Sequence, residues 1–300
     1  MRLFLTTIAA LFLLVGVAFA GSTPDPNTAD KSLGKAGKLR YASDSDPLKL
    51  SNSGYAFPIA GCGPETYNTV GGGVRMPGPD PGTRRIAGSK PFDWYDTDSL
   101  PEDGWSVSGF GGSAGKLTSY AICAKGVNLE YKSGTVPEQP KAVRTFGIAC
   151  PGDTDVIGGG SQIATSQSYI NSSYPYDNGD KGKAPNNGWA VRVFDTIGGS
   201  GGFQVFAICA KQEKVSYKTA TAKKLKSNHA SNQKLSCPKV EHAVSGGSKV
   251  SGPGDGAHLE GSYPFDSGDK GKVPDDGFKL STFNDHGSKK NVRSTLICLG

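Results

Sequence analysis

The sequence predicts an all-β protein made of three tandem repeats of about 88 residues, each with about four antiparallel strands. Two cysteines recur in every repeat, 61, 59 and 61 residues apart. The apolar runs are short and rich in Val, Ile, Tyr and Phe, a composition typical of strands. No long stretch places apolar residues at the spacing of an amphipathic helix. The 43 glycines and 19 prolines interrupt the apolar runs before a helix could form.

The first 20 residues have the pattern of a secretory signal peptide. An apolar stretch follows Met1-Arg2 and ends with Ala18-Phe19-Ala20. An uncleaved anchor is the alternative, but the apolar run is short for a membrane span. We therefore expect a secreted protein, extracellular or periplasmic, with no membrane span after cleavage. The expected segments are a signal peptide (1–20), a flexible N-terminal segment (21–38) and three β repeats (39–126, 127–213 and 214–300).

Each repeat carries the same succession of short motifs. In the second repeat these are the glycine cluster Ile157-Gly158-Gly159-Gly160, the Ser-x-Pro motif Ser173-Tyr174-Pro175, the alternating run from Trp189 and the closing run to Cys209. One strand at each motif gives the four core strands of a unit. We expect a closed body with pseudo-threefold symmetry, β-prism or trefoil-like, because closure buries more surface than separate units. Three beads on a string are the alternative, since a unit of this length could just fold alone.

The six cysteines predict three disulfides in an exported chain. The pairing that treats all repeats alike is Cys62–Cys123, Cys150–Cys209 and Cys237–Cys298, which would tie the first strand of each unit to its last. A rival is a ring of Cys123–Cys150, Cys209–Cys237 and Cys62–Cys298. No C-x-x-C motif is present, which excludes zinc-ribbon and thioredoxin-type sites.

The candidate binding site is a loop that recurs after each Ser-x-Pro motif. Aromatic side chains beside carboxylates are typical of sugar sites, and three linked copies would add avidity. The predicted architecture resembles β-prism and trefoil lectins in fold class, which by itself implies no function. The candidate ligand-binding residues are Asp93, Trp94, Asp96, Tyr174, Asp177, Asp180, Tyr263, Asp266 and Asp269.

Two other interpretations apply to the same loop. Oxygen-rich side chains at short spacing suit Ca²⁺, which takes six to eight oxygen ligands. The loop lacks the EF-hand order, and lysines inside the second and third copies oppose a cation. The other interpretation is turn chemistry, because Asp and Asn side chains accept hydrogen bonds from nearby backbone amides.

Catalytic motifs are weak. The G-x-S-x-G matches at 111–115 and 198–202 lie in glycine-rich hairpins with no following helix, unlike a nucleophile elbow. The four histidines do not recur between repeats, and we expect them on the surface or in turns. Asp275-Asp276 could serve as the paired carboxylates of a glycosidase. The lysines between Lys211 and Lys239 fit a protected edge strand or a contact with anionic glycans.

The net charge of +6 is modest and dispersed, which argues against a nucleic-acid partner. We therefore predict a secreted non-catalytic binding or structural protein, with an extracellular glycan or cell-surface component as the candidate partner. A secreted hydrolase that uses paired carboxylates is the alternative. No cofactor is predicted beyond the calcium hypothesis, and the sequence leaves the oligomeric state open.

Overall fold

The structure is a computed structural model, and it describes most of the chain after residue 28. The described residues are 29–32, 38–48, 55–63, 66–78, 81–94, 98, 100–111, 115–137, 142–164, 168–179, 182, 184–195, 202–211, 214–252, 256–268 and 273–300. The predicted signal peptide lies outside these residues, as do Asp96, Asp180 and Asp269. No helix in the described part of the chain is long and apolar enough to cross a membrane.

The all-β prediction is confirmed. The first repeat contributes β2 (Lys38–Leu48), β3 (Tyr55–Ala56), β4 (Ile59–Gly61), β5 (Asn68–Arg75), β6 (Arg85–Phe92), β7 (Gly104–Phe110) and β8 (Gly115–Lys125). The second contributes β9 (Leu129–Pro137), β10 (Val143–Ala149), β11 (Asp155–Ile163), β12 (Ser168–Tyr176), β13 (Gly188–Asp195) and β14 (Gly202–Ala210). The third contributes β15 (Val215–Thr219), β16 (Lys223–Leu225), β17 (His229–Ser236), β18 (His242–Ser251), β19 (Ala257–Phe265), β20 (Gly277–Asn284) and β21 (Lys290–Leu299).

Each repeat therefore has six strand positions, four of which are the predicted core strands. The structure adds a strand before the opening cysteine, formed by β3 and β4, by β10 or by β17. Both β10 and β17 are sheet edges and contain many exposed residues; in β17 the buried positions are the polar Ser231 and Gln233, which give no apolar signal. The strand at the first position pairs with the strand at the sixth position of the same repeat. These pairs are β2 with β8, β9 with β14, and both β15 and β16 with β21.

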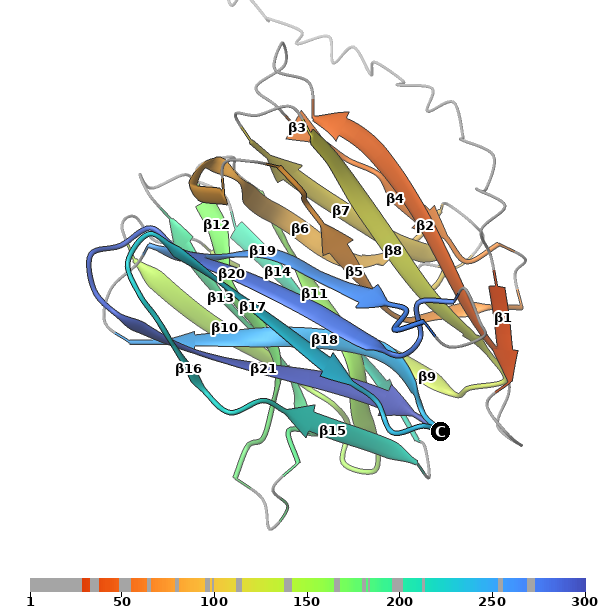
Figure 1. Cartoon of the computed structure of the whole chain (residues 1–300). Helices are drawn as coiled ribbons and strands as arrows, with labels where there is room; N and C mark the ends of the chain where they lie inside the picture. Colours follow the sequence, from red (N-terminus) through yellow and green to blue (C-terminus); the bar gives the residue numbers. More distant parts are fainter. Residues whose placement is uncertain are drawn as a thin grey trace, which may run out of the picture.

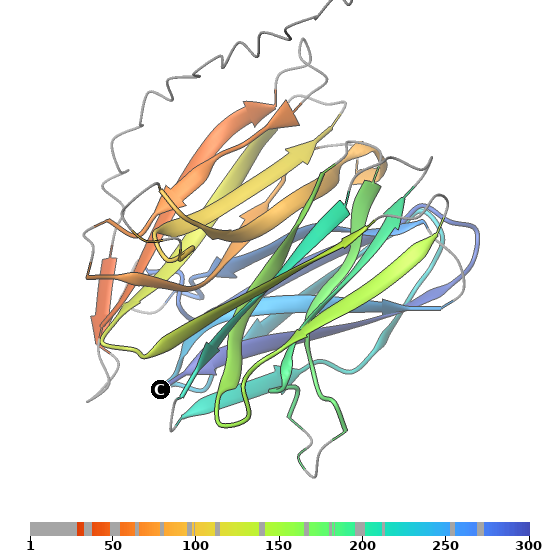
Figure 2. The ribbon, with the colours of Figure 1, turned by 180° about the vertical axis from the view of Figure 1, so that it is seen from behind.

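Three antiparallel sheets form the molecule, and each takes strands from two repeats. The first sheet has the order β1-β2-β8-β5-β19-β20-β17. The second has β10-β13-β12-β18-β21-β15, with β16 also on β21, and the third has β3-β7-β6-β11-β14-β9, with β4 also on β7. Figure 1 shows the blue β19 of the third repeat beside β5 of the first, and Figure 2 shows the other side of the body. The closed pseudo-threefold arrangement is thus observed, and the beads-on-a-string alternative is wrong.

The N-terminal segment differs from its prediction at one place. We expected residues 21–38 to be flexible, but Ala29–Ser32 form β1, an edge strand of the first sheet. This strand pairs antiparallel with β2 from Lys38 to Tyr41. Edge backbone groups of β2 would otherwise lack partners, and β1 supplies them.

The glycine clusters bring the three repeats into contact at the centre. A Cβ on Gly72 or Gly159 would lie 2.2 or 2.3 Å from the ring of Trp105 or Trp189, so the indole packs directly on the glycine backbone. A Cβ on Gly71 would lie 2.1 Å from the carbonyl oxygen of Val244 in the third repeat. Only glycine permits these approaches.

In the first two repeats, the serine of the Ser-x-Pro motif accepts a hydrogen bond from the tryptophan indole that packs on the glycine cluster. Trp105 Nε1 donates to Ser89 Oγ at 2.9 Å, and Trp189 Nε1 donates to Ser173 Oγ at 2.8 Å. The third repeat has Phe278 at this position, which has no N–H to donate. Ser262 Oγ instead donates to the carbonyl oxygen of Gly246 at 2.7 Å. A hollow of about 30 Å³ lies among these residues. It has room for about one water molecule, so it is no ligand site.

A tyrosine in the first strand of each repeat joins it to another repeat. Each hydroxyl donates to a backbone carbonyl next to a glycine cluster. The three bonds are Tyr41 to Ala243 at 2.8 Å, Tyr131 to Thr69 at 2.8 Å and Tyr217 to Val156 at 2.7 Å. They run from the first repeat to the third, from the second to the first and from the third to the second. The repeats are therefore linked in a closed ring.

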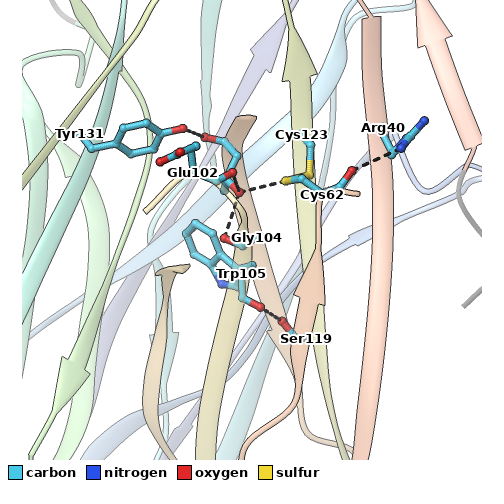
Figure 3. The surroundings of a disulfide bond; sticks show 9 residues. Arg40, Cys62, Glu102, Gly104, Trp105, Ser119, Cys123 and Tyr131 are labelled. Carbon is cyan, nitrogen blue, oxygen red and sulfur yellow. Dashed lines mark hydrogen bonds between the residues drawn. A yellow bond between two sulfur atoms is a disulfide. The ribbon is translucent and has the colours of Figure 1, made fainter. Parts of the chain in front are cut away.

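The disulfides are Cys62–Cys123, Cys150–Cys209 and Cys237–Cys298, the pairing that treats the repeats alike. The ring pairing is therefore wrong. We expected each bridge to tie the first strand of a unit to its last. That expectation is wrong, because each opening cysteine directly follows the strand at the second position. The bridge joins two sheets instead: Cys62 follows β4 of the third sheet, and Cys123 lies in β8 of the first (Figure 3).

Candidate functional site

The carboxylates of the recurring loop hold the loop itself. The side chains of Asp103, Asn187 and Asp276 accept hydrogen bonds from the backbone nitrogens of Trp94, Asn178 and Ser267 at 2.6, 3.0 and 2.6 Å. Asp177 and Asp266 accept from the nitrogens of Gly179 and Gly268, both at 2.7 Å. Those glycines have φ values of 88° and 91°, which favour glycine. The contacts of Asp177 and Asp266, each to an amide two residues further on, are the Asx turns that the turn-chemistry interpretation predicts.

The three loops lie on three different sheets. They follow β6, β12 and β19, which belong to the third, second and first sheets. Within the described residues, no group of three or more His, Cys, Asp or Glu side chains is placed to hold a metal ion. The carboxylates that are described serve loop geometry instead.

The candidate aromatic residues separate into two environments. Trp94 is 46 % exposed beyond the end of β6, with its ring edge-on to Phe92 at 5.6 Å between centroids. Tyr174 and Tyr263 lie within β12 and β19, on the face opposite the serines that line the central hollow. Both tyrosines are partly exposed. They therefore belong to the outer faces of two sheets rather than to the acidic loops.

Around Tyr263 the outer face of the first sheet carries a row of aromatic and cationic side chains. We call Tyr120, Arg75, Tyr263, Lys279, Lys234 and Phe265 the aromatic–cation row. The strand register places Lys234 opposite Lys279 and Lys279 opposite Tyr263, while Gly261 is opposite Arg75 and Gly73 opposite Tyr120. Because side chains two residues apart in a strand share a face, all six point to one side of the sheet.

The contacts within the row are close. The rings of Tyr120 and Tyr263 stack at 6.0 Å between centroids, with 18° between their planes. Arg75 Cζ lies 5.5 Å and Lys279 Nζ 6.0 Å from the centre of the Tyr263 ring. Lys234 Nζ lies 4.0 Å from the centre of the Phe265 ring. These are cation–π distances. Burial raises the pKa of Tyr120, and the Arg75 guanidinium partly offsets this shift.

The other two sheets carry reduced versions of the row. On the second sheet Lys249 Nζ lies 5.2 Å from the centre of the Tyr174 ring, and on the third Lys90 Nζ lies 5.2 Å from that of Phe206. The positions of Lys279 and Arg75 are occupied by Ala190 and Lys249 in one sheet and by Ser106 and Gln162 in the other. Only the first sheet has three cations and three aromatic rings in the row.

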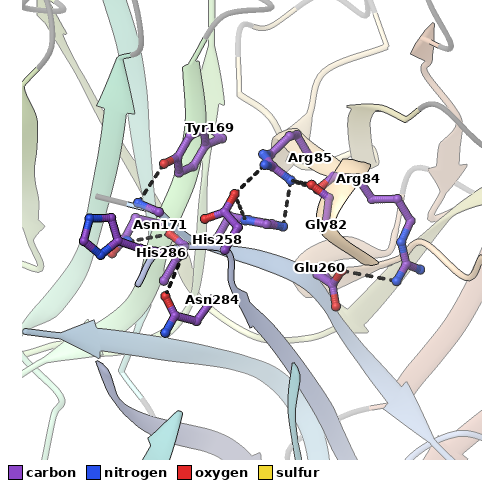
Figure 4. A network of polar contacts seen from close by, with 12 residues as sticks. Gly82, Arg84, Arg85, Tyr169, Asn171, His258, Glu260, Asn284 and His286 are labelled. Carbon is purple, nitrogen blue, oxygen red and sulfur yellow. Dashed lines mark hydrogen bonds and ion pairs between the residues drawn. The ribbon is translucent and has the colours of Figure 1, made fainter. Parts of the chain in front are cut away.

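The recurring loops follow the C-terminal ends of β6, β12 and β19. At the N-terminal ends of the same strands, three different residues that occupy equivalent positions meet. Arg85, Tyr169 and His258 each precede the Ser-x-Pro serine by four residues, and each begins or nearly begins its strand. Arg85 Nη1 donates to His258 Nε2 at 2.9 Å, and its guanidinium lies 5.3 Å from the centre of the Tyr169 ring (Figure 4). Arg85 Nη2 also pairs with Asp285 Oδ2 at 2.7 Å.

His258 and the neighbouring Arg84 and Glu260 are buried, and the members of the cluster pair with one another. His258 is 0 % exposed, which corrects the expectation that the histidines lie on the surface or in turns. Arg84 Nη2 pairs with Glu260 Oε1 at 3.2 Å beside it. Burial raises the pKa of Glu260, although Arg84 and Arg85 act to lower it. The contacts join all three repeats, so the cluster contributes to the closure of the molecule. The common offset from the serine marks the three positions as equivalent, but it does not show that they meet.

The carboxylate pair of the hydrolase hypothesis is also engaged. Asp275 is 2 % exposed, and its Oδ2 lies 2.6 Å from His242 Nδ1. The equivalent pair in the second repeat is Asn186 Nδ2 donating to Asp155 Oδ1 at 2.7 Å. Both pairs join the end of the recurring loop to the start of a third-position strand. Asp275 and His242 therefore bridge the same junction that Asn186 and Asp155 bridge in the second repeat.

Comparison with known proteins adds no family. Neither a scan against protein-family models nor a search of curated proteins finds a match for this chain. The functional argument therefore depends on the geometry of the sheets.

Proposed function

We propose that the protein is a secreted, non-catalytic binding protein that recognises an acidic polysaccharide through the aromatic–cation row. The observation that carries this proposal is the partly exposed row of three aromatic rings and three cations on the first sheet. Tyrosine rings offer flat apolar faces with a polar hydroxyl, which suits the faces of sugar rings. Arginine and lysine are the natural partners of carboxylate or sulfate groups.

The shape of the row fits an extended ligand. It crosses β17, β20, β19, β5 and β8, which are neighbours in the first sheet. Adjacent strands are about 4.8 Å apart, so the row spans on the order of 19 Å. A polymer can contact every member of such a row at once, and linked weak contacts give avidity. A single small sugar would reach only part of it.

The repeats show that the fold does not require the row. Lys279 has Ala190 and Ser106 at its equivalent positions, and Tyr120 has Phe206 and Thr295. All three repeats nevertheless form the same strands with the same pairing. The fold therefore does not require Lys279 or Tyr120 at these positions, which favours a binding role for them.

The cysteines support the proposed compartment. Disulfides form and persist in oxidising compartments. The three disulfides therefore support secretion, together with the N-terminal pattern of the sequence.

Trp94, exposed in the loop after β6, is a candidate for a separate sugar contact on the third sheet.

The test compares acidic and neutral polymers on the secreted chain. Isothermal titration with polygalacturonate, dextran sulfate and neutral dextran is expected to show binding of an acidic polymer only, weakening as salt screens the charges. The double variant Arg75→Gln with Lys279→Ala installs residues that other repeats carry at these positions. We expect its affinity for the acidic polymer to fall about tenfold or more.

The matched control is Lys249→Gln, which removes the equivalent cation from the second sheet. It is expected to leave most of the affinity in place. Equal binding of neutral and acidic polymers, or unchanged affinity in the double variant, would refute the proposal.

A further inference from the structure

A second cationic feature lies where the edges of two sheets meet. A groove of about 300 Å³ runs between β16, which pairs with β21 of the second sheet, and β17, the edge strand of the first. Figure 1 shows β16 and β17 in teal on this side of the body. The polar and charged residues that line it are Lys223, Lys224, Lys226, His229, Ser231 and Asn232. We call it the lysine groove.

The lysines of the groove are held on a fixed backbone. Lys223 and Lys224 pair with Val292 and Asn291 of β21. The next residue, Leu225, is buried in a small apolar cluster with Val250, Ala257 and Val292. The three ammonium groups thus project from an anchored strand and the turn that follows it. Within the described residues, none of the three forms an ion pair with a carboxylate.

The turn after β16 is also fixed. Asn228 adopts a left-handed φ of 56°, and its backbone nitrogen donates to the carbonyl oxygen of Asn284 at 2.6 Å. His229 Nδ1 lies 2.6 Å from the carbonyl oxygen of Ser227, so this nitrogen carries the proton and donates.

The charge of the groove indicates the class of its ligand. Three lysines line it, and no ion pair in the described part of the chain neutralises them. Ser231 also lines the groove, but its hydroxyl oxygen is sealed from solvent, so a ligand in the groove does not reach it. The natural partner of a groove with three ammonium groups is an anionic group.

We propose that the lysine groove binds a tetrahedral oxyanion, the sulfate or phosphate monoester group of an extracellular ligand. Lys223, Lys224 and Lys226 balance its charge. Lysine binds such groups as a point charge. The groove has the volume of a small ligand pocket, at the lower end of the usual range of about 300–1,000 Å³. This proposal is independent of the aromatic–cation row, whose residues lie on the outer face of the first sheet.

The test is titration of the secreted chain with inorganic sulfate and inorganic phosphate at constant ionic strength, followed by amide chemical shifts in NMR. We expect saturable shifts at residues of β16 and β17. Glucose 6-sulfate and glucose 6-phosphate then distinguish the two sources of the group. Either ester binding supports the proposal, whereas no saturable shift with any of the four probes overturns it.

Variants separate a binding role from a structural one. The double variant Lys224→Gln with Lys226→Gln is expected to weaken oxyanion binding about tenfold or more. The melting temperature of this variant is expected to stay unchanged, because both lysine side chains are exposed. A lower melting temperature with unchanged oxyanion binding would show a structural role of the two lysines and overturn the proposal.

The control is Lys218→Gln, an exposed lysine of β15 outside the groove. It is expected to bind oxyanions as the parent does. Arg75→Gln with Lys279→Ala is likewise expected to retain oxyanion binding, so a failed polysaccharide proposal would leave this one standing. If the control and the groove variants lost equal oxyanion affinity, the net charge of the protein alone would explain the binding, and the proposal would be overturned.

Discussion

Single residues show how the repeats are joined. Tyr131 of the second repeat donates its hydroxyl to the carbonyl of Thr69 in the first, and equivalent bonds complete the ring. Burial raises the pKa of all three tyrosines, and nearby carboxylates raise it further. These phenols therefore stay protonated in the folded protein where free tyrosines would begin to ionise.

Tyr131→Phe is expected to lower the free energy of unfolding by about 1–2 kcal/mol at neutral pH, because it leaves the buried carbonyl of Thr69 without this partner. A raised folded pKa stabilises the protein fully below about pH 10, where the unfolded tyrosine is also protonated. That contribution declines as the pH rises above about 10 toward the higher folded pKa. Urea unfolding at pH 7 and above pH 10 measures both effects.

The control for Tyr131→Phe is Tyr55→Phe, which alters a tyrosine that is 44 % exposed. It is expected to change neither the free energy of unfolding nor its alkaline dependence. If the two variants unfolded identically, the Tyr131–Thr69 hydrogen bond would not contribute to joining the repeats.

Among the elements, the disulfides connect sheets rather than strands of one sheet. Cys150 follows β10 of the second sheet and bonds Cys209 in β14 of the third. Cys237 follows β17 of the first sheet and bonds Cys298 in β21 of the second. With Cys62–Cys123 the three bridges connect all three sheets in a cycle. Each bridge also closes a loop of nearly the same length, so the repeats gain similar stabilisation.

Replacing both Cys150 and Cys209 by Ala is expected to cost about 4 kcal/mol of stability, the chain-entropy value for a loop of about 60 residues. Guanidinium unfolding of the double variant against the parent measures it. The matched variant without Cys62 and Cys123 closes a loop of similar span and is expected to lose a similar amount. Parent-like unfolding of both variants would show that the bridges do not stabilise the fold.

For the whole molecule, the sharing of sheets decides which unit can fold. In the second repeat β11 pairs with β6 of the first, and β12 pairs with β18 of the third. An excised repeat exposes both of these strand edges and the glycine cluster that packs against other repeats. Its own disulfide and four remaining strand pairs do not replace those contacts.

The isolated segment 127–213 is therefore not expected to exist as a stable folded monomer. It should be unfolded, or it should assemble into a trimer that regenerates the shared sheets with copies of itself. Circular dichroism with light scattering after size-exclusion chromatography distinguishes these states. A folded monomer with the thermal stability of the full chain would contradict the proposed role of the shared sheets.

Comparison within the chain predicted much of the architecture. Repeated spacing identified the three units, and short β-branched and aromatic runs identified the core strands, because both signals are local or periodic. The cysteine pairing followed because one pairing treats the three units alike. The turn role of Asp177 and Asp266 was also predictable, since an Asx turn involves only neighbouring residues.

Only the tertiary structure decided how the units share their sheets. Pairing of β5 with β19 joins residues that are almost 190 positions apart in the chain, and no local pattern specifies such a partner. The same holds for the meeting of Arg85, Tyr169 and His258 and for the row around Tyr263. Alternation along a strand shows which residues share its face, but the cross-repeat hydrogen bonds determine which faces become one surface.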